Sequence, residues 1–460
     1  MRLFKFEVIA RRKLLVAAVF AANLSIFSAG MMESWSSPVL PKLLSNNTEE
    51  NPLGYPISDD EESWIGSLIS LGAVVGPFIS AFSADHIGRK RTLLALALPL
   101  IISFTILIFA QHIILFYIAR FLSGVSIGGI FAVLPTYIAE VSEVSIRGMM
   151  STSMNNFEVL GVFMSYAIGP YLTLRTFNVI CALVPVLFVA VFLLMPDSPY
   201  YLIAKDKKEQ AKHCLKRLRC TTDAKAEKEM EEIKISVDKY LGSKYTDILN
   251  SRSNIKALII SLSLISFQQL SGVNIITFYT QILFDATGSS IPSEISAVII
   301  GGVQVIAAFV TPFVVDKLGR KILLLISATG MLLSEIPLGV YYYLHDKGTD
   351  LTDLYWLPVT CLVFYITVFN FGFGPLPWTM MSELFPDNVK AVATSLTTSI
   401  CWFLSFILTK YFESVSAHIG MGGSFWIFSG FNFMAIIFVF LWVPETKGKT
   451  FEEIQEDLRR

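Results

Sequence analysis

Twelve long apolar segments constrain the fold of this chain more than any other feature. A helix needs about 20 mostly apolar residues to cross the hydrocarbon core of a bilayer. Only 16% of the residues are charged, against roughly 25% in soluble proteins. We therefore predict an all-α integral membrane protein with twelve transmembrane helices, at residues 14–36, 63–84, 93–111, 115–139, 152–172, 177–195, 256–284, 294–315, 322–344, 355–381, 391–412 and 424–443.

The distribution of lysine and arginine predicts how the chain is oriented. These residues accumulate in the cytoplasmic loops of membrane proteins. With the N-terminus inside, the cytoplasmic segments hold 31 of the 36 lysines and arginines. The first apolar segment is too long for a signal peptide and lacks a small-residue cleavage site, so we expect it to stay in the membrane. We predict a multi-pass protein with both termini in the cytoplasm.

The spans divide into two sets of six. The predicted domains are an N-terminal six-helix bundle (1–195), a charged cytoplasmic linker (196–255), a C-terminal six-helix bundle (256–443) and a cytoplasmic tail (444–460). The linker stretches DKKEQAKHCLKRLR and DAKAEKEMEEIK contain strong helix formers. We expect short helices there, the alternative being a solvated linker without structure.

Three short motifs occur once in each half and in the same order. DHIGRK (85–90) pairs with DKLGRK (316–321), EVSEVSIRG (140–148) with ELFPDNVKA (383–391), and PDSP (196–199) with PETK (444–447). The offsets are 231, 243 and 248 residues. Parallel repeats of six spans are found in transporters that bind their substrate near the bilayer midplane, between the two halves.

The charged residues of these motifs predict a gate at the cytoplasmic side. An arginine can pair with a carboxylate of a neighbouring helix end, and an aspartate can accept hydrogen bonds from backbone N–H groups. Such contacts form in one conformation and break in another. The alternative is that the charges only mark the cytoplasmic side. The predicted gate residues are Asp85, Arg89, Glu140, Arg147, Asp316, Arg320, Glu383 and Lys390.

An ordered set of motifs gives the chain a family resemblance over essentially its whole length. Besides the repeated motifs, the set includes RFLSGVSIGG (120–129), QQLSGVNIITFYT (268–280), GFGPLPWTMMSELFP (372–386) and PETKGKTFEEI (444–454). The chain resembles the sugar porters of the major facilitator superfamily. The sequences of its motifs look closest to those of insect facilitated trehalose transporters and their hexose-carrying relatives. The resemblance implies the major facilitator fold and a carrier of the plasma membrane that moves sugar by alternating access.

The polar residues inside the spans indicate where a sugar would bind. Sugar hydroxyls need uncharged hydrogen-bonding side chains, and sugar faces pack on aromatic rings. QQLSGVN supplies Gln268, Gln269 and Asn274 within seven residues of one span. The alternative is that these amides join helices to one another. The resemblance assigns five further substrate-binding positions, which are Asn155, Gln304, Asn370, Trp378 and Trp402.

The chain departs from the family pattern at several positions. Among the binding residues, Asn155 stands in the place of a glutamine and Asn370 in that of a glutamate. Cys401 replaces a polar asparagine that usually precedes the tryptophan at position 402. Phe278 replaces a tyrosine at the exterior lid of the site, where Tyr279 remains. Tyr200 and Lys390 stand where the family has arginine. Because lysine cannot make the planar bidentate pair of arginine, we predict a weaker cytoplasmic lock, particularly in the second half.

The resemblance also bears on proton coupling. Proton-coupled members have an aspartate in the first span where this chain has Met31, which favours passive facilitation. Carboxylates inside membranes are costly and often functional. Glu158, one helical turn from Asn155, is the candidate proton site. For Glu33 we consider a place at the exterior interface, and for Glu335 a neighbouring partner or a wet crevice.

Other functional classes are disfavoured. The sequence contains no nucleotide loop, metal-ligand cluster or nucleophile constellation, so we predict no enzyme, no metal and no cofactor. The predicted partners are a small sugar and the lipid bilayer, without nucleic acid or an obligate protein partner. A hexose such as glucose is preferred over trehalose as substrate, and a proton symporter or a non-transporting sugar sensor remains as an alternative. Asn46 begins a glycosylation sequon in the first exterior loop.

Overall fold

The computed structural model describes residues 12–459 apart from 144–145, 241–250, 288–290, 386, 448 and 450. Within its helices the side chains of 236, 238–240, 316–317, 352, 382, 387–388, 390–391, 451–452 and 459 are not described. Two predicted gate side chains, Asp316 and Lys390, therefore lie outside the described part.

The described chain is almost entirely helical. Several spans are broken into two helices, whereas the last two spans run together as one helix with a break at Gly420, where the backbone is non-helical. The first half comprises α2 (Lys13–Glu33), α3 (Ser36–Leu44), α4 (Asp59–Ile87), α5 (Arg89–Phe109), α6 (Ile113–Val141), α7 (Arg147–Ile168) and α8 (Leu174–Phe192). The second half comprises α12 (Arg252–Leu270), α13 (Val273–Phe278), α14 (Thr280–Asp285), α15 (Ser293–Leu318), α16 (Arg320–Asp346), α17 (Leu357–Phe371), α18 (Leu376–Leu384) and α19 (Asp387–Trp442).

Nine segments of the described chain are long and apolar enough to cross a membrane. One of them, Val392–Trp442, contains two helices that meet at Gly420. Of the predicted spans, α7 and α12 are not among the nine. Both carry polar residues of the candidate site, Asn155 and Glu158 on α7, and Gln268 and Gln269 on α12. Their polar faces lower their hydropathy, and with them the chain has the twelve spanning segments of the major facilitator fold.

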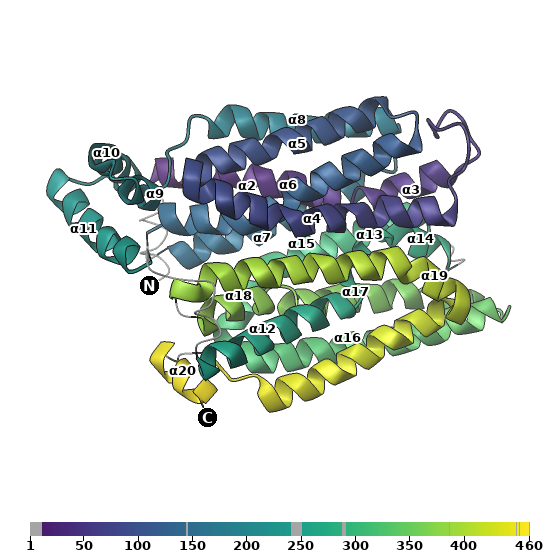
Figure 1. Cartoon of the computed structure of the whole chain (residues 1–460). Coiled ribbons are helices and arrows are strands. Elements are labelled where there is room, and N and C mark those ends of the chain that lie inside the picture. Colours follow the sequence, from purple (N-terminus) through teal and green to yellow (C-terminus); the bar gives the residue numbers. More distant parts are fainter. Residues whose placement is uncertain are drawn as a thin grey trace.

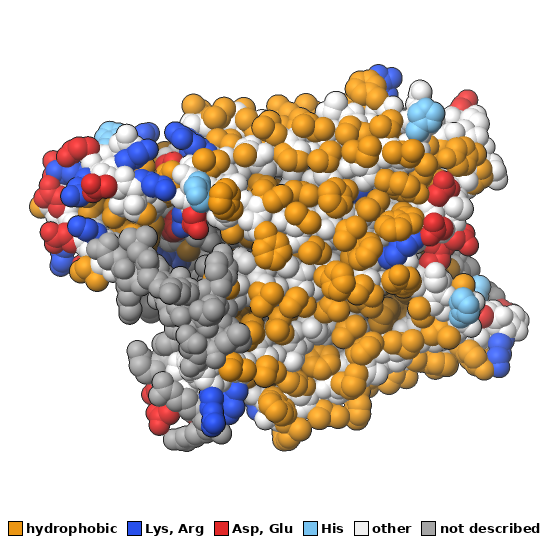
Figure 2. Space-filling view, in the orientation of Figure 1, with side chains coloured by type: hydrophobic (Ala, Val, Ile, Leu, Met, Phe, Trp, Pro, Cys, Tyr) orange, Lys and Arg blue, Asp and Glu red, His pale blue; other side chains and the backbone are white. Residues whose placement is uncertain are grey.

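The helices pack as two groups that lie side by side along their length (Figure 1). In the first group α4, α5 and α6 pack together and α2 packs against α7 and α8, while in the second α16 packs against α17 and α19. The groups meet where α4 packs against α19 and α7 against α15. Hydrophobic side chains cover the middle of the visible surface, and charged side chains gather at its two ends (Figure 2).

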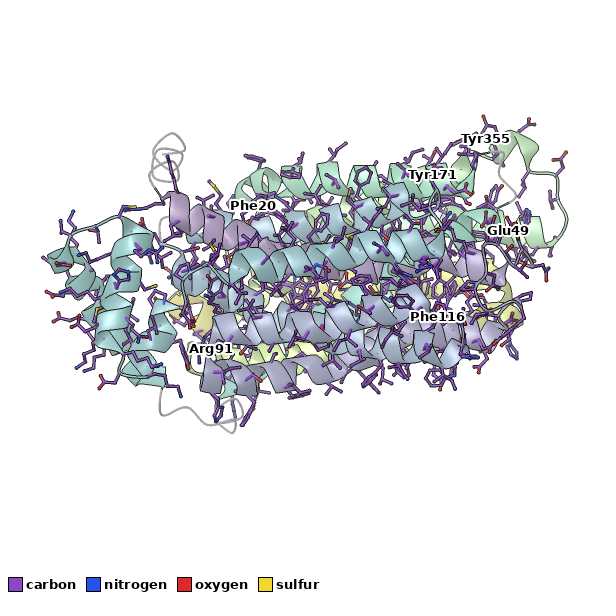
Figure 3. The ribbon with its side chains drawn as sticks, turned by 90° about the horizontal axis from the view of Figure 1, so that it is seen from above. Phe20, Glu49, Arg91, Phe116, Tyr171 and Tyr355 are labelled. Atoms are coloured by element: carbon purple, nitrogen blue, oxygen red, sulfur yellow. The ribbon has the colours of Figure 1, made fainter. Side chains whose placement is uncertain are left out.

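The two ends of the molecule differ in their helices. One end, here called the linker end, carries α9 (Pro199–Ala204), α10 (Lys208–Arg219), α11 (Asp223–Tyr240) and the tail helix α20 (Phe451–Arg459) (Figure 1). The opposite end, here called the far end, carries the segment between α3 and α4. In a view turned by 90°, Arg91 lies toward the linker end, and Glu49, Tyr171 and Tyr355 lie at the far end (Figure 3).

The three linker helices are attached to the first half by buried contacts. Arg219 at the end of α10 is 4% exposed, donates a hydrogen bond of 2.6 Å to the Val141 carbonyl and pairs with Glu229 at 3.0 Å. It thereby caps the C-terminus of α6, where carbonyl groups lack helical partners. In place of the family's arginine, Tyr200 packs against the buried cluster of Leu215, Ala226 and Ile233. Of the linker helices, α9 packs against α6 and α10 against α2, while α11 packs on α9 and α10 and also touches α19 of the second half.

The repeated DHIGRK and DKLGRK turns have the same backbone in both halves. Gly88 and Gly319 have φ angles of 93° and 92°, and each glycine ends one helix and begins the next. L-residues with a side chain rarely adopt this conformation. An added Cβ would also lie 2.7 Å from the Tyr201 ring at Gly88 and 2.8 Å from the Glu445 carboxylate at Gly319. The glycine of each turn is thus required by both backbone and packing.

Candidate substrate site and gate

A chain of uncharged polar groups crosses from the second half to the first. Asn274 Nδ2 donates to Gln269 Oε1 at 2.5 Å and to Ser405 Oγ at 2.6 Å, while Gln269 Nε2 donates to Cys401 Sγ at 3.0 Å. The hydroxyls of Ser405 and Ser70 are 2.8 Å apart, and Ser70 belongs to α4 of the first half. Two of the three predicted amides therefore bond to each other, and Cys401 accepts a hydrogen bond in the place of the family's asparagine.

Gln268 bonds to the broken span rather than to the other amides. Its Nε2 donates to the carbonyl oxygens of Phe373 at 2.6 Å and Gly374 at 2.8 Å. These carbonyls lie in the gap between α17 and α18, where Pro375 and Pro377 interrupt the helix. Freed backbone groups inside a membrane must be satisfied by neighbours. In this conformation Gln268 supports the break in the tenth span.

Three predicted groups have no hydrogen-bond partner among the described residues. Asn155 on α7 and Gln304 on α15 are both half-buried, and α7 packs against α15. Trp402 is 8% exposed, and its Nε1 is buried without an acceptor. Its ring packs edge-on against Phe131 of α6 at 5.7 Å. A buried unpaired donor costs free energy, so Trp402 Nε1 lacks an acceptor that it needs in this conformation.

The remaining two predicted binding residues, Asn370 and Trp378, are held by contacts within the second half. Asn370 is 5% exposed, and its Nδ2 donates to the Ile366 carbonyl of its own helix at 2.8 Å. Trp378 on α18 is half-buried and packs against the hydrophobic core. Asn370 is thus occupied within α17 in this conformation, and Trp378 keeps part of its ring accessible.

One carboxylate of the first half, Glu33, is buried next to a buried arginine, and Glu158 lies on the adjoining helix. Glu33 is 7% exposed, and its Oε1 is buried without a hydrogen-bond partner among the described residues. Arg120 is fully buried and donates to the carbonyls of Ile65 at 2.8 Å and Met32 at 2.7 Å. Half-buried Glu158 is on α7, where its backbone carbonyl lies against Gly30. The close helix contact at Gly30 brings Glu158 near the Glu33 end of α2.

Glu335 is the third carboxylate inside the spans. It is 1% exposed, and its Oε2 accepts a hydrogen bond of 2.8 Å from Asn432 Nδ2 in the last span. The expectation that Glu335 pairs with a neighbour is confirmed. It joins α16 to α19 within the second half, away from the interface between the halves.

The two halves are bonded to each other at the far end. The Phe278 carbonyl accepts from Ser36 Oγ at 3.0 Å, and the Thr277 carbonyl accepts from Tyr166 OH at 2.7 Å. Lys410 Nζ lies 2.6 Å from the Asp60 carboxylate of α4. Nearer the linker end, residues 152–158 of α7 are all half-buried, whereas its other half contains the buried Val162, Ser165 and Tyr166. The conformation is closed at the far end.

The three repeated motifs meet at one point in the first half. Arg89 Nη2 and Nε each lie 3.1 Å from Glu140 Oε1, and the hydroxyl of Ser198 donates to Glu140 Oε2. Asp85 is 75% exposed and lies 3.6 Å from Arg89 Nη1. The turn, the end of α6 and the start of the linker are therefore tied by one carboxylate.

The second half repeats this arrangement. Arg320 Nη2 lies 2.8 Å from Glu383 Oε1, and Thr446 Oγ1 donates to Glu383 Oε2 at 2.5 Å. Glu445 accepts hydrogen bonds of 3.0 Å from the backbone N–H groups of Arg320 and Lys321, at the start of α16. We call Arg89–Glu140–Ser198 and Arg320–Glu383–Thr446 the two triads.

Two of the predicted gate residues have other contacts than expected in this conformation. Arg147 forms no ion pair within the described residues, and its Nε is buried without an acceptor. The carboxylate nearest to it in the sequence, Glu143, instead lies 2.7 Å from Arg12 Nε. Asp85 contacts the Arg89 side chain and not backbone N–H groups. In the second half, Glu445 is the carboxylate that accepts from backbone N–H groups. Each triad joins segments of its own half, and neither triad links one half to the other.

Ser198, Thr446 and Glu445 were not identified as functional residues from the sequence. The signal for them was the third repeated motif, in which Ser198 and Thr446 both lie two residues after the proline. Ser198 also accepts from the Tyr201 N–H at 3.3 Å, as an ordinary helix N-cap does. A search of the described residues finds no group of three or more histidine, cysteine, aspartate or glutamate side chains placed to hold a metal ion.

Comparisons with known proteins agree with this architecture. A family model described as "Sugar (and other) transporter" matches residues 14–458. The chain is 33% identical to the facilitated trehalose transporter Tret1 of Bombyx mori, over 96% of this chain and 86% of that protein. It is 32% identical to the facilitated trehalose transporter Tret1 of Anopheles gambiae over 96% of this chain, but spans only 56% of that protein's length.

Solved structures show the same fold. The proton:xylose symporter XylE bound to 6-bromo-6-deoxy-D-glucose matches with a TM-score of 0.77 and 23% identity, over 97% of this chain and 99% of that chain. An inward-open structure of the xylose transporter XylE from E. coli matches with a TM-score of 0.79 and 22% identity, over 96% and 99% of the two chains. At this level of identity the similarity establishes the fold.

Proposed function

Because the chain belongs to the sugar (and other) transporter family, we propose that it is a facilitative carrier that moves a sugar across the plasma membrane by alternating access. The substrate is glucose or another hexose. The linker end faces the cytoplasm together with both termini, which agrees with the lysines and arginines concentrated in that part of the sequence. The closed far end then faces the exterior, so this conformation is one that releases sugar inward.

The observation that carries the proposal is the set of uncharged polar groups contributed by both halves. Asn155 from the first half, and Gln304 and Trp402 Nε1 from the second, have no protein partner in the described part of the chain. Sugar hydroxyls would satisfy them. Gln268, Gln269, Asn274 and Asn370 complete the proposed site by exchanging their protein partners for sugar in another conformation, with Trp378 as an aromatic wall.

The cytoplasmic gate consists of the two triads together with Asp85, Arg147, Asp316 and Lys390. Each triad joins a turn, a helix end and the segment after the sixth or twelfth span. Each triad lies within its own half, so it makes the linker-end surface of that half rigid. The surfaces then close against each other as rigid bodies when the exterior side opens.

Facilitation is favoured over proton coupling by the groups that bridge the halves. The chain from Cys401 to Ser70 contains no titratable carboxylate, and Met31 is 1% exposed at the position of the coupling aspartate. The alternative is coupling through Glu158, which lies on the same helix as Asn155. A Glu158→Gln variant tests it, because transport that loses an acid stimulation present in wild type would establish coupling.

Trehalose is the second candidate substrate. The most similar proteins described above are named trehalose transporters, whereas the amide positions resemble those of glucose carriers. The two sugars share the same hydroxyl chemistry, so a direct transport measurement is needed to separate them.

The decisive experiment is uptake of labelled glucose and labelled trehalose into proteoliposomes that contain the full chain, at pH 5.5 and 7.5 with and without a protonophore. We expect saturable glucose uptake that equilibrates without accumulation at either pH. Accumulation abolished by the protonophore would replace facilitation with symport. Uptake of trehalose alone would reassign the substrate, and binding of a sugar without uptake would indicate a sensor.

Asn46 is the proposed glycosylation site. It is exposed in the segment after α3, at the far end. This placement is compatible with an exterior glycan on a plasma-membrane protein. Removal of the glycan from the protein expressed in insect cells should shift its gel mobility, and Asn46→Gln should abolish the shift.

A further inference from the structure

Two grooves open between helices in the parts of the halves that adjoin the linker end. The first lies between α2 and α8, has a volume of about 690 Å³, and is lined by Lys13, Phe20 and Met195 among other residues. Phe20 is labelled in Figure 3. The second lies between α12 and the end of α19, has a volume of about 350 Å³, and is lined by Lys256, Lys321, Ile259, Trp442, Val443 and Leu458.

The grooves occupy equivalent positions in the two repeats. Each lies between the first and the last span of its half. Lys256 follows Lys13 by 243 residues, and Val443 follows Met195 by 248 residues, which are offsets of the repeated motifs. The comparison between the grooves therefore isolates what differs in their chemistry.

The groove of the second half differs in being lined by two lysines, neither of which has a side-chain acceptor among the described residues. In the first half Lys90 Nζ donates to the carbonyls of Leu193 at 2.8 Å and Met195 at 2.6 Å, so it caps the end of α8. Its counterpart Lys321 has no such acceptor among the described residues and lies with Nζ 5.9 Å from the Phe440 ring. Lys321 and Lys256 both line the groove.

Apolar side chains around the second groove are exposed to the surroundings. Trp442 is 59% exposed, Leu441 66% and Ile259 45%. Tryptophan is enriched where the hydrocarbon core meets the headgroups. The carboxylate that also lines the groove, Asp457 of α20, is engaged by Lys449 at 2.7 Å. The groove thus offers two ammonium groups beside an apolar wall at the membrane boundary.

We propose that this second-half groove binds the phosphate of an anionic phospholipid from the leaflet at the linker end. Lysine binds phosphate as a point charge, and basic pockets between spans on the cytoplasmic side recognise anionic headgroups. The acyl chains lie along Ile259, Leu441 and Trp442. The bound lipid contacts α12, α19 and α20 at once, so it holds the tail helix against a span that carries the sugar-site amides.

The proposal uses the orientation given above but does not depend on which sugar is carried. Free inorganic phosphate shares the chemistry of the headgroup, so the experiment separates the two. The full chain is placed in nanodiscs of phosphatidylcholine with a minor fraction of phosphatidylglycerol, and the lipids retained are counted by native mass spectrometry. The variants are Lys256→Gln/Lys321→Gln and, as the matched control in the first-half groove, Lys13→Gln.

We expect wild type and Lys13→Gln to retain phosphatidylglycerol selectively, and the double variant to bind it about 30-fold more weakly, at roughly fivefold for each ammonium near an anionic surface. Equal retention by the double variant, or an equal loss in Lys13→Gln, would overturn the proposal. Displacement of the lipid by millimolar inorganic phosphate would show that a free phosphate is the ligand instead. If the double variant melts earlier than wild type in pure phosphatidylcholine, Lys256→Gln and Lys321→Gln are tested singly. Each should then weaken phosphatidylglycerol binding about fivefold, and no loss in either would overturn the proposal.

Discussion

The linker-end surfaces of the two halves contain the same triad but anchor the neighbouring turn differently. In both halves an arginine of the GRK turn and a hydroxyl after the last span bind one glutamate. In the second half Glu445 also accepts from the backbone N–H groups at the start of α16. Among the described residues of the first half no side chain caps the start of α5, and Lys90 instead binds the end of α8. The repeat has preserved the ion pair and varied the contacts that hold it.

Burial also differs between the triads. The side chain of Glu140 is 12% exposed and that of Glu383 is 24% exposed, while Arg89 and Arg320 are similar at 19% and 18%. The two guanidinium groups are equally exposed, so the difference lies in the carboxylates. An ion pair with less access to water is screened less, and its loss costs more free energy. The first triad should therefore contribute more to stability.

The largest effect is expected from removing the glutamate of each triad. Glu140→Ala should lower the free energy of unfolding by about 3 kcal/mol and Glu383→Ala by about 2 kcal/mol, since each leaves an arginine and a hydroxyl without their shared acceptor. Unfolding in mixed micelles, followed by tryptophan fluorescence, measures both. A greater loss for Glu383→Ala would reverse the comparison of the two triads.

The sugar site provides the next comparison between halves. Gln304→Ala should raise the KM for sugar about tenfold, and Asn155→Ala about threefold, because each removes one neutral hydrogen bond and asparagine has the shorter reach. Initial uptake rates at varied sugar concentration measure both. Gln268→Ala should in addition lower stability, because it leaves the carbonyls at Phe373 and Gly374 unpaired. Unchanged KM in both site variants would remove Asn155 and Gln304 from the site.

Much of the fold was predictable because it depends on local patterns. The length of the apolar segments sets the number of spans, and the repeated charged turns mark corresponding helix ends. The pairing of Arg89 with Glu140 followed from opposite charges in two repeated motifs. Glu335 was expected to have a partner because a carboxylate inside a membrane is costly alone.

The details of the site were harder to predict because they depend on residues far apart in the sequence. Gln268 bonds to carbonyls 105 residues away, which are free only because the tenth span is broken there. Ser198 has the local pattern of an N-cap, and nothing in that pattern indicates that its hydroxyl also reaches Glu140. Arg147 was predicted as a gate residue, yet the sequence does not show that the nearby Glu143 pairs with Arg12, which lies 131 residues away.

The N-terminal cap of α16 should have a smaller effect than the triads or the sugar site. Burial opposes ionisation of Glu445, but hydrogen bonds from the backbone N–H groups of Lys447, Arg320, Lys321 and Thr446 outweigh it and lower its pKa below 4.5. Glu445→Gln should lower stability by about 1 kcal/mol. A lowered carboxyl pKa stabilises the folded state above the unfolded value, and this contribution is lost as the pH falls through the folded value.

The pH dependence of Glu445→Gln separates a charge effect from a packing effect. The difference in stability between wild type and variant should be full at pH 6 and shrink below pH 4.5. Asp197→Asn is the matched control in the first half, since the Asp197 carboxylate accepts only from the neighbouring Ser198 N–H among the hydrogen bonds described for it. A difference that persists unchanged at low pH would mean that the charge of Glu445 does not stabilise α16.

The smallest effect is expected at Tyr200, where the sequence predicts a weakened lock and the structure gives the side chain a packing role. Its ring contacts the cluster of Leu215, Ala226 and Ile233 that holds α10 and α11 together. Tyr200→Arg should therefore speed hydrogen exchange in α10 and α11 about threefold, because local opening depends on buried apolar contacts. Tyr200→Phe keeps the ring and should leave exchange unchanged. If Tyr200→Arg instead keeps full protection and shifts the balance between inward and outward conformations, the missing arginine matters as a lock, and the first half is the weaker gate.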